Sequence, residues 1–112
     1  SHQQYGFGSY IVCLADGTPV GMVGLFQRHA LAIPDLGFAL LANYEGKGII
    51  TSAARLLMAK KHVLDLGVLA AITSQTNIGS QKVLQKLGFE FIGDVIINDD
   101  NQPLKLLLNS KL

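Results

Sequence analysis

The sequence predicts an α/β fold whose sheet is mixed and mostly antiparallel, with one central strand–helix–strand crossover. Apolar and β-branched segments separated by turn residues predict six strands, and two segments with helical spacing interrupt them. The resulting order is β-β-β-α-β-α-β-β, without internal repeats. Strands joined by short turns pair antiparallel, whereas two strands joined through a helix pair in parallel by a right-handed crossover.

The first part of the chain predicts a β-hairpin. Residues 9–15 are rich in β-branched and aromatic side chains, and residues 20–27 form the expected second strand. Between them, residues 16–19 (DGTP) have the composition of a turn. Gly21 and Gly24 inside the second strand indicate a bulge or the close approach of another backbone.

A short buried strand at 36–41 and a long amphipathic helix at 47–66 follow. Apolar residues share one face of this helix: Ile50, Ala53, Ala54, Leu57 and Leu64. Polar residues share the opposite face: Thr51, Arg55, His62 and Asp65. Gly67 follows this segment and is expected to cap the C-terminal end of the helix. Residues 69–73 (LAAIT) are almost entirely apolar, which predicts a central strand covered on both faces.

A second helix and a second hairpin complete the predicted fold. Thr76 or Asn77 caps a helix of roughly ten residues. Its inward face carries Val83, Leu84 and Leu87. Gly88 ends this helix in the left-handed conformation. Residues 89–97 and 104–108 then form the last two strands, joined by a polar turn.

The composition excludes several classes of protein. Hydrophobic residues make up 49% of the 112 residues and charged residues 15%, which excludes a disordered chain. The net charge of +1, without a dense basic block, argues against nucleic-acid binding. The apolar stretches are too short to span a membrane. Cys13 is the one cysteine, so neither a disulfide nor a metal site is expected, and the predicted compartment is the cytoplasm. Residues 1–2 have the appearance of a tag remnant, which leaves a single domain over 3–112 with its core at 9–109.

The segment 40–51 (LLANYEGKGIIT) has the clearest chemical meaning. A buried strand enters a glycine-containing loop, and this loop leads into the first turn of the long helix. Unpaired N–H groups and the positive end of the dipole attract phosphate to a helix N-terminus. Gly46 and Gly48 lack the Cβ atoms that would hold a pyrophosphate away from those groups. The same pattern by itself also fits an ordinary helix start.

A second segment, 74–89, places Asn77 and Ser80 at the start of the second helix, where capping alone explains both residue types. Together the two segments resemble the GNAT superfamily of acetyl-CoA-dependent N-acetyltransferases, in particular its ribosomal-protein N-terminal acetyltransferase-like branch. The matching pieces are 21–28 (GMVGLFQR), 35–41 (DLGFALL) with 44–48 (YEGKG), 71–73 (AIT) with Asn77 and Ser80, and 83–89 (VLQKLGF). They run in order from about Tyr10 to Leu108, and the resemblance implies the GNAT fold.

The resemblance also implies an acetyl-CoA site. In this family two neighbouring strands diverge, and the pantetheine arm pairs with backbone groups of the first, which here belong to Ala39, Leu40 and Leu41. The pyrophosphate is expected on N–H groups of Gly46, Lys47, Gly48 and Ile49. Asn77 is expected to bind the pantetheine chain, and Ser80 to lie near the thioester sulfur. No metal is implied.

In the family a primary amine attacks the thioester directly, so the protein mainly positions the reactants and stabilises the developing oxyanion. Ser80 is the candidate general acid for the leaving thiolate. The base is either Asp35 or a chain of waters, and Asp35 also fits a solvated loop acid. Cys13 is expected to be a small core residue, since the mechanism needs no covalent intermediate. His29 and His62 are expected on the surface.

The sequence departs from the family in two ways. Asn43 stands where the family's loop usually has Gln or Arg. The chain opens near the family's second strand, without the segment that ordinarily builds the acceptor pocket. This second departure keeps open the alternative of a CoA-binding module without catalysis. The apolar composition and small size keep open a structural or interaction domain. The edge near Ser9 predicts a homodimer through strand pairing. The acceptor is expected to be a protein N-terminus or a small amine.

Overall fold

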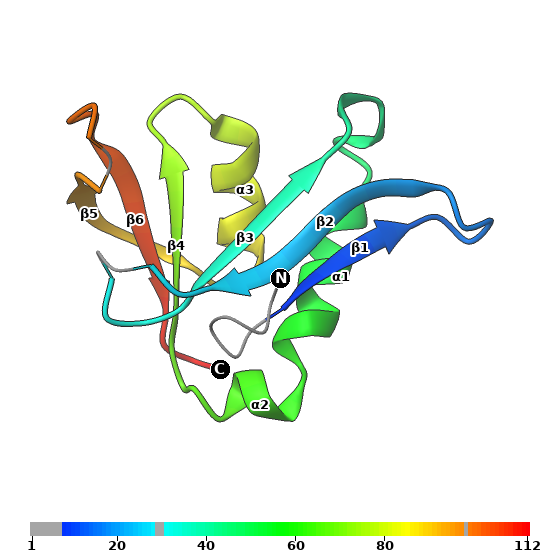
Figure 1. Ribbon diagram of the computed structural model, residues 1–112, viewed down its shortest axis with the longest axis horizontal. Helices are drawn as coiled ribbons and strands as arrows, with labels where there is room; N and C mark the ends of the chain where they lie inside the picture. The colour runs from blue at the N-terminus through cyan, green and yellow to red at the C-terminus, as the bar shows by residue number, and fades with distance from the viewer. Residues whose placement is uncertain (1–7, 29–30, 98) are drawn as a thin grey trace.

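The computed structural model of the chain describes residues 8–28, 31–97 and 99–112 (Figure 1). They form one six-stranded sheet with helices packed against it. The strands are β1 (Ser9–Cys13), β2 (Pro19–Phe26), β3 (Asp35–Leu40), β4 (Leu69–Ser74), β5 (Glu90–Val95) and β6 (Leu104–Asn109). The helices are α1 (Ile49–Met58), α2 (Lys61–Leu64) and α3 (Ile78–Lys86), with a short 3-10 turn, η2, at Ala42–Tyr44.

The strand order across the sheet is β1-β2-β3-β4-β6-β5. Within the described residues β3 and β4 form the one parallel pair, and the chain between them passes through α1 and α2. All other neighbouring strands pair antiparallel. The predicted mixed, mostly antiparallel sheet with a central β-α-β crossover is therefore confirmed.

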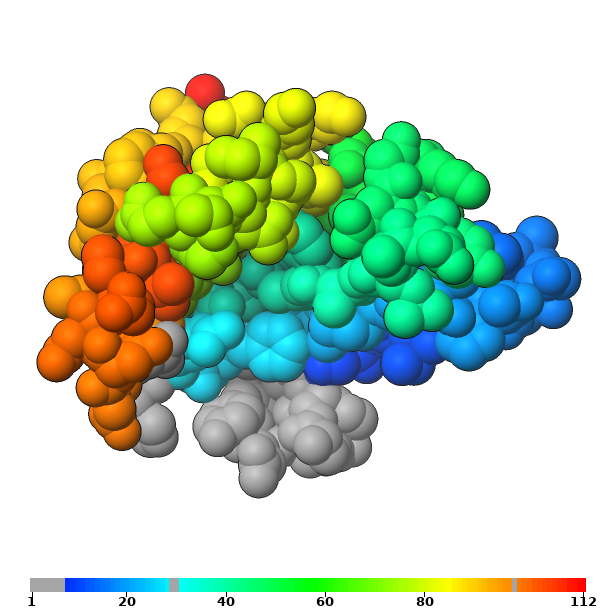
Figure 2. Space-filling model, turned by 90° about the horizontal axis from the view of Figure 1, so that it is seen from above, coloured from blue at the N-terminus to red at the C-terminus, as the bar shows by residue number. Residues whose placement is uncertain are grey.

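Helices α1 and α3 lie on the same side of the sheet (Figure 2). The core between helices and sheet consists of Val23, Leu25, Leu36, Ala54, Leu57, Val63, Leu69, Ala71, Leu84, Leu87, Phe89 and Leu107. Each described α-helix contributes to this one core, and the side chain of Ile72 on β4, which alternates to the other face, is half-buried. The described helices thus cover β4 from one side, in contrast to the two covered faces that its apolar sequence predicted.

The predicted helix 47–66 is in fact two helices, α1 and α2. The break lies at Lys60, whose backbone is extended at φ −68° and ψ 142°. Because the second helix restarts after an extended residue, its buried face is out of phase with that of the first. Val63 is therefore fully buried, while Leu64 is 44% exposed, contrary to its predicted place on the inward face.

The structure confirms the predictions for two glycines and for His62 and contradicts the one for Cys13. A Cβ added at Gly21 would collide with the Ala39 carbonyl oxygen on β3, which confirms the close backbone approach. Gly88 ends α3 at φ 94°, as predicted. The prediction for Cys13 is wrong, because this residue is exposed at the end of an edge strand. His62 is exposed, as expected, whereas His29 and residues 1–2 lie outside the described residues.

Candidate active site

The sheet opens between its two central strands. β3 and β4 share a single parallel bridge, Asp35 opposite Ala70, and the Ala70 N–H donates to the Pro34 carbonyl oxygen at 2.9 Å. Beyond this point each strand stays paired with its outer neighbour, and the two strands diverge toward their carboxyl ends (Figure 1). The gap therefore lies where the chain enters the α1 loop from β3 and the α3 loop from β4.

A cleft of about 440 Å³ occupies this end of the sheet. Its walls come from β3, the loop before α1, α1 itself and the start of α3. Four of the residues predicted for the cofactor site line it: Leu40, Gly46, Asn77 and Ser80. Figure 2 shows the hollow between α3 and the start of α1. The fold thus brings the continuous segment 38–50 together with the start of α3, which lies well beyond it in the sequence.

The register of the β2–β3 pair determines which backbone groups of β3 face the gap. The Leu41 N–H donates to the Val20 carbonyl oxygen at 2.8 Å. Antiparallel pairs alternate, so Ala39 also directs its N–H and carbonyl groups toward β2. The corresponding groups of Leu40 and of Phe38 point the other way, into the gap. Of the three residues predicted to pair with the pantetheine arm, Leu40 has this orientation, whereas Ala39 and Leu41 face β2.

The loop before α1 leaves room for a ligand close to the helix start. Gly46 and Gly48 have positive φ values of 80° and 75°, and a Cβ added at either would meet no atom within 4 Å. Gly48 is the N-cap of α1 and provides no side-chain hydrogen bond to the first turn. Lys47 is exposed, with its Nζ 5.7 Å from the centre of the Tyr44 ring. Such a helix start favours an anion.

The start of α3 is fixed by hydrogen bonds from two side chains. Asn77 Oδ1 accepts from the Ser80 N–H at 3.0 Å, so Asn77 is the N-cap, as the capping explanation requires. Gln81 Nε2 donates to the carbonyl oxygens of Ser74 at 3.2 Å and Gln75 at 3.3 Å. Within the described residues, no hydrogen bond occupies the Asn77 amide nitrogen or the Ser80 hydroxyl. These two groups are thus free to meet a molecule in the cleft.

Sequence reasoning missed the roles of Phe38 and Gln81 in this arrangement. The orientation of Phe38 follows from strand register, for which the local sequence carries no signal. Gln81 does stand one turn after the capping residue, where a long amide side chain can reach back to the preceding loop, so its position offered a weak signal.

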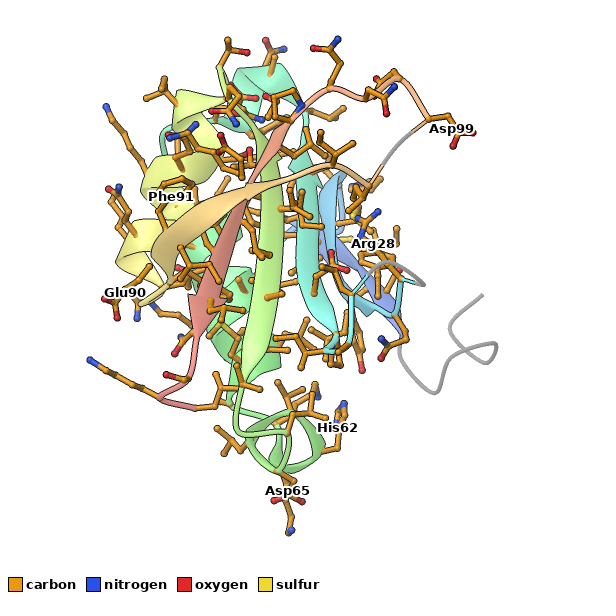
Figure 3. All side chains as sticks on the ribbon, turned by 90° about the vertical axis from the view of Figure 1, so that its left-hand side faces the viewer. Arg28, His62, Asp65, Glu90, Phe91 and Asp99 are labelled. Carbon is orange, nitrogen blue, oxygen red and sulfur yellow. The ribbon has the colours of Figure 1, made fainter. Side chains whose placement is uncertain are left out.

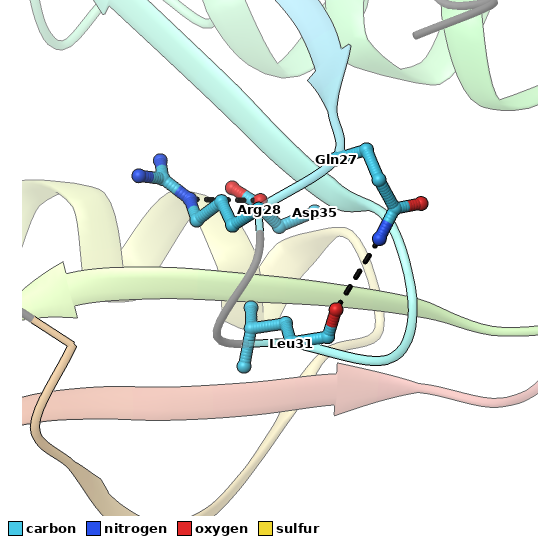
Figure 4. Close-up of polar contacts among 4 residues, drawn as sticks. All are labelled: Gln27, Arg28, Leu31 and Asp35. Carbon is cyan, nitrogen blue, oxygen red and sulfur yellow. Dashed lines mark hydrogen bonds and ion pairs between the residues drawn. The ribbon is translucent and has the colours of Figure 1, made fainter.

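Asp35 lies outside the cleft. It is the first residue of β3, five positions before Leu40, which corresponds to roughly 16 Å along a strand. Its side chain is 1% exposed, and Arg28 Nε donates to its Oδ1 at 2.9 Å (Figure 4). Burial raises the pKa of the Asp35 carboxyl, and the Arg28 guanidinium partly opposes this effect. The interpretation of Asp35 as a solvated loop acid is therefore wrong, because β3 starts one residue earlier than predicted.

The described residues were compared with the requirements of a metal site and of a membrane-spanning helix. In the described parts of the chain, no three side chains of the His, Cys, Asp or Glu type gather closely enough to hold a metal ion. None of the helices described has the length and apolar character needed to cross a membrane.

The geometry agrees with what comparison with known proteins finds. Residues 1–90 match the family model of the acetyltransferase (GNAT) domain. The chain is 37% identical over 115 residues to the Bacillus subtilis (strain 168) protein named "Probable N-acetyltransferase YjcK", and the match covers 94% of this chain and 62% of that protein. The chain therefore spans less than two thirds of this relative.

Solved structures share the fold at lower identity. The ribosomal-protein-S5-alanine acetyltransferase from Vibrio fischeri has a TM-score of 0.77 at 23% identity, covering 98% of this chain and 64% of that one. A mutant of the spermidine N-acetyltransferase SpeG from Vibrio cholerae has a TM-score of 0.73 at 18% identity, covering 95% of this chain and 66% of that one. With the family model matching most of the chain and the same fold in these structures, the protein belongs to the GNAT acetyltransferase family.

Proposed function

We propose that the protein is an N-acetyltransferase that moves an acetyl group from acetyl-CoA to a primary amine by direct attack. The observation that carries this proposal is the cleft at the open end of the sheet, where β3 and the glycine loop meet the start of α3. Members of the GNAT family use acetyl-CoA as cosubstrate. The volume of the cleft lies in the range of typical small-molecule sites.

The residues present fit this cosubstrate. The pyrophosphate would lie on the N–H groups of 46–49 (Gly46, Lys47, Gly48 and Ile49), where missing Cβ atoms leave space at both glycines. The pantetheine arm would pair with the backbone of Leu40 and Phe38, whose polar groups face the gap. The Asn77 amide nitrogen would donate to the arm while Asn77 Oδ1 continues to cap α3.

The reaction requires one bond to form and one to break. The amine nitrogen bonds to the thioester carbonyl carbon, the C–S bond breaks, and the nitrogen loses one proton. We assign Ser80 as the group that protonates the departing thiolate, since this serine lines the cleft from the first turn of α3. A base takes the proton from nitrogen, and the candidates are Asp35 and a chain of waters.

The position of Asp35 supports its candidacy through the direction of β3. An arm that pairs first with Leu40 and then with Phe38 runs toward the point where β3 and β4 converge, and Asp35 forms the bridge there. The thioester is the inner end of such an arm. A buried carboxyl with a raised pKa is a common feature of acid–base catalysts.

Thermal unfolding tests the cosubstrate site. Acetyl-CoA at about a hundred times its dissociation constant should add about 2.7 kcal/mol to the free energy of unfolding. For a domain of this size, that corresponds to a rise of roughly ten degrees in Tm. The absence of any shift would contradict the proposal and favour a structural or interaction domain.

A panel of amines then separates an enzyme from a binding module. Spermidine and a peptide with N-terminal alanine are suitable acceptors, because the neighbouring structures are named for acetylation of such groups. We expect amine-dependent release of free thiol. Tight binding of acetyl-CoA without thiol release from any amine would instead identify a CoA-binding module without catalysis.

We further infer a cytoplasmic homodimer joined through β1. This strand is at the edge of the sheet and contains no charged residue, and its Ile11 is 69% exposed. Natural proteins usually protect such edges with charges. Light scattering of the wild type and of Ile11→Lys tests the dimer, since a charge at the centre of the paired strands should yield monomers. A monomeric wild type at high concentration would contradict it.

A further inference from the structure

The ion pair between Arg28 and Asp35 is unusual because one of its members is almost completely buried. The Asp35 side chain is 1% exposed, and its Oδ2 is buried without a hydrogen-bond partner among the described residues. The Arg28 side chain is 45% exposed and contacts Oδ1 through Nε alone. A buried carboxylate is costly unless it is paired and fully hydrogen-bonded. The structure thus places a carboxyl group with one unpaired oxygen in the centre of the sheet.

The pair lies on the face of the sheet opposite the helices. Leu36 and Phe38 pack toward the core under α1, so the alternation of β3 directs Asp35 to the other face. Arg28 follows the end of β2 and lies on the side of the sheet away from α3 (Figure 3). Gln27 Nε2 donates to the Leu31 carbonyl oxygen at 3.2 Å within the same loop (Figure 4).

Among the described residues, Arg28 is the charged group that acts on Asp35. Phe26 stands opposite Asp35 on β2, and Ala70 is its partner on β4. Neither brings a charge, and Arg28 is the one charge found to affect the pKa of Asp35. A substitution of Arg28 should therefore change the pKa of the Asp35 carboxyl without a contribution from a third ionisable group on the described strands.

We propose that Arg28 is a positioning residue for proton transfer, which holds Asp35 by one oxygen and leaves Oδ2 available for the proton of the acceptor amine. This inference rests on the proposed function and takes Asp35, one of its two candidates, as the base. As the C–N bond forms and the C–S bond breaks, Oδ2 takes the proton from nitrogen through intervening water, because Asp35 lies outside the cleft. The proton leaves to solvent once the products have gone, and Arg28 itself neither gains nor loses one.

The positive charge of Arg28 has a second consequence for this step. A buried carboxyl without a cationic neighbour favours its neutral form, which has no capacity to accept a proton. The guanidinium stays charged at all relevant pH values, so it favours the ionised form throughout. A neutral side chain at this position should leave Asp35 protonated over a wider range of pH.

The test is the pH dependence of kcat/KM for the wild type, Arg28→Gln and Arg28→Lys. We expect Arg28→Gln to move the acidic limb of the profile upward by about one pH unit, with about tenfold lower activity below it and recovery at higher pH. Arg28→Lys should restore most of the wild-type profile. Lys61→Gln is the matched control, because it removes the exposed Lys61–Asp65 pair and should change nothing.

Measurements of acetyl-CoA affinity and of the Asp35 pKa distinguish a failure of the Arg28 role from a failure of the cosubstrate site. The affinity for acetyl-CoA should stay within about twofold in all variants, because Arg28 lies outside the cleft. An NMR titration of the Asp35 side chain, assigned with Asp35→Asn, should show the higher pKa in Arg28→Gln regardless of turnover. If Arg28→Gln does not fold, Arg28→Lys decides, since the retained positive charge must keep the acidic limb near that of the wild type, and a shifted limb would contradict the role of Arg28.

Two results would overturn the inference. Normal acetyl transfer with an unshifted limb in Arg28→Gln, or a loss of activity that is equal at every pH, would exclude the role of Arg28 and leave the proposed function intact. A wild type that binds acetyl-CoA but acetylates no amine would exclude the proposed reaction together with this role.

Discussion

Gly46 offers the most direct test of the proposed pyrophosphate site. It lines the cleft, has a φ of 80°, and has open space where a Cβ would stand. Asp and Asn both tolerate the left-handed region better than other residues, so Gly46→Asp and Gly46→Asn should both fold. The two variants have nearly the same shape and differ in one negative charge. Comparison of the two isolates the electrostatic effect on binding.

The expected magnitude follows from Coulomb's law. At about 5 Å, two unit charges repel by about 0.8 kcal/mol in water and by about 3 kcal/mol at an effective dielectric constant near 20. A pyrophosphate carries at least two charges, and residue 46 is exposed, so the value for water sets the lower limit. The doubled lower limit, about 1.7 kcal/mol, corresponds to more than tenfold weaker binding.

Isothermal titration with acetyl-CoA measures this difference. Gly46→Asn should bind several-fold more weakly than the wild type, because its side chain enters the cleft, and Gly46→Asp should bind at least about tenfold more weakly than Gly46→Asn. The gap between the two variants should shrink as salt is added, since the site is open to solvent. Equal affinities of Gly46→Asp and the wild type would refute the assignment of the loop.

Three more outcomes are expected. Asn77→Ala removes the N-cap of α3 and should lower the free energy of unfolding by about 1 kcal/mol in urea unfolding, whereas Asn77→Asp retains the cap. Leu57→Ala in the core should cost about 2–5 kcal/mol, and Leu56→Ala, at a side chain that is 74% exposed, should change stability by less than about 0.5 kcal/mol; equal effects would contradict the assigned core. Because burial raises the pKa of Asp35, the folded state binds its proton more tightly, so stability should fall as pH rises from the ordinary value of 3.8 through the raised one. Urea unfolding across this range should show the decline in the wild type and lose it in Asp35→Asn.

Much of the fold can be predicted from the sequence, because the patterns that indicate strands, helices and turns are local. Alternation, capping residues and glycines act between neighbours in the chain, so the order of the six strands followed from them. Of the two capping candidates, Thr76 and Asn77, the structure has Asn77 at the start of α3, and Gly88 ends this helix as predicted. The two segments that line the cleft carry their own signals in the same way. Gly46 and Ser80 were predicted from these local signals, and both line the same cleft in the structure.

The sequence by itself thus predicted the class of fold, the order of the six strands and the two segments that line the cleft. Tertiary structure alone decided that the long helix breaks at Lys60, that Phe38 faces the gap while Ala39 does not, and that Asp35 is buried against Arg28. These features depend on strand register and on burial, which arise from contacts between residues distant in the chain. Local periodicity carries no record of such contacts, and a shift of one residue in register would reverse which backbone groups face the cleft.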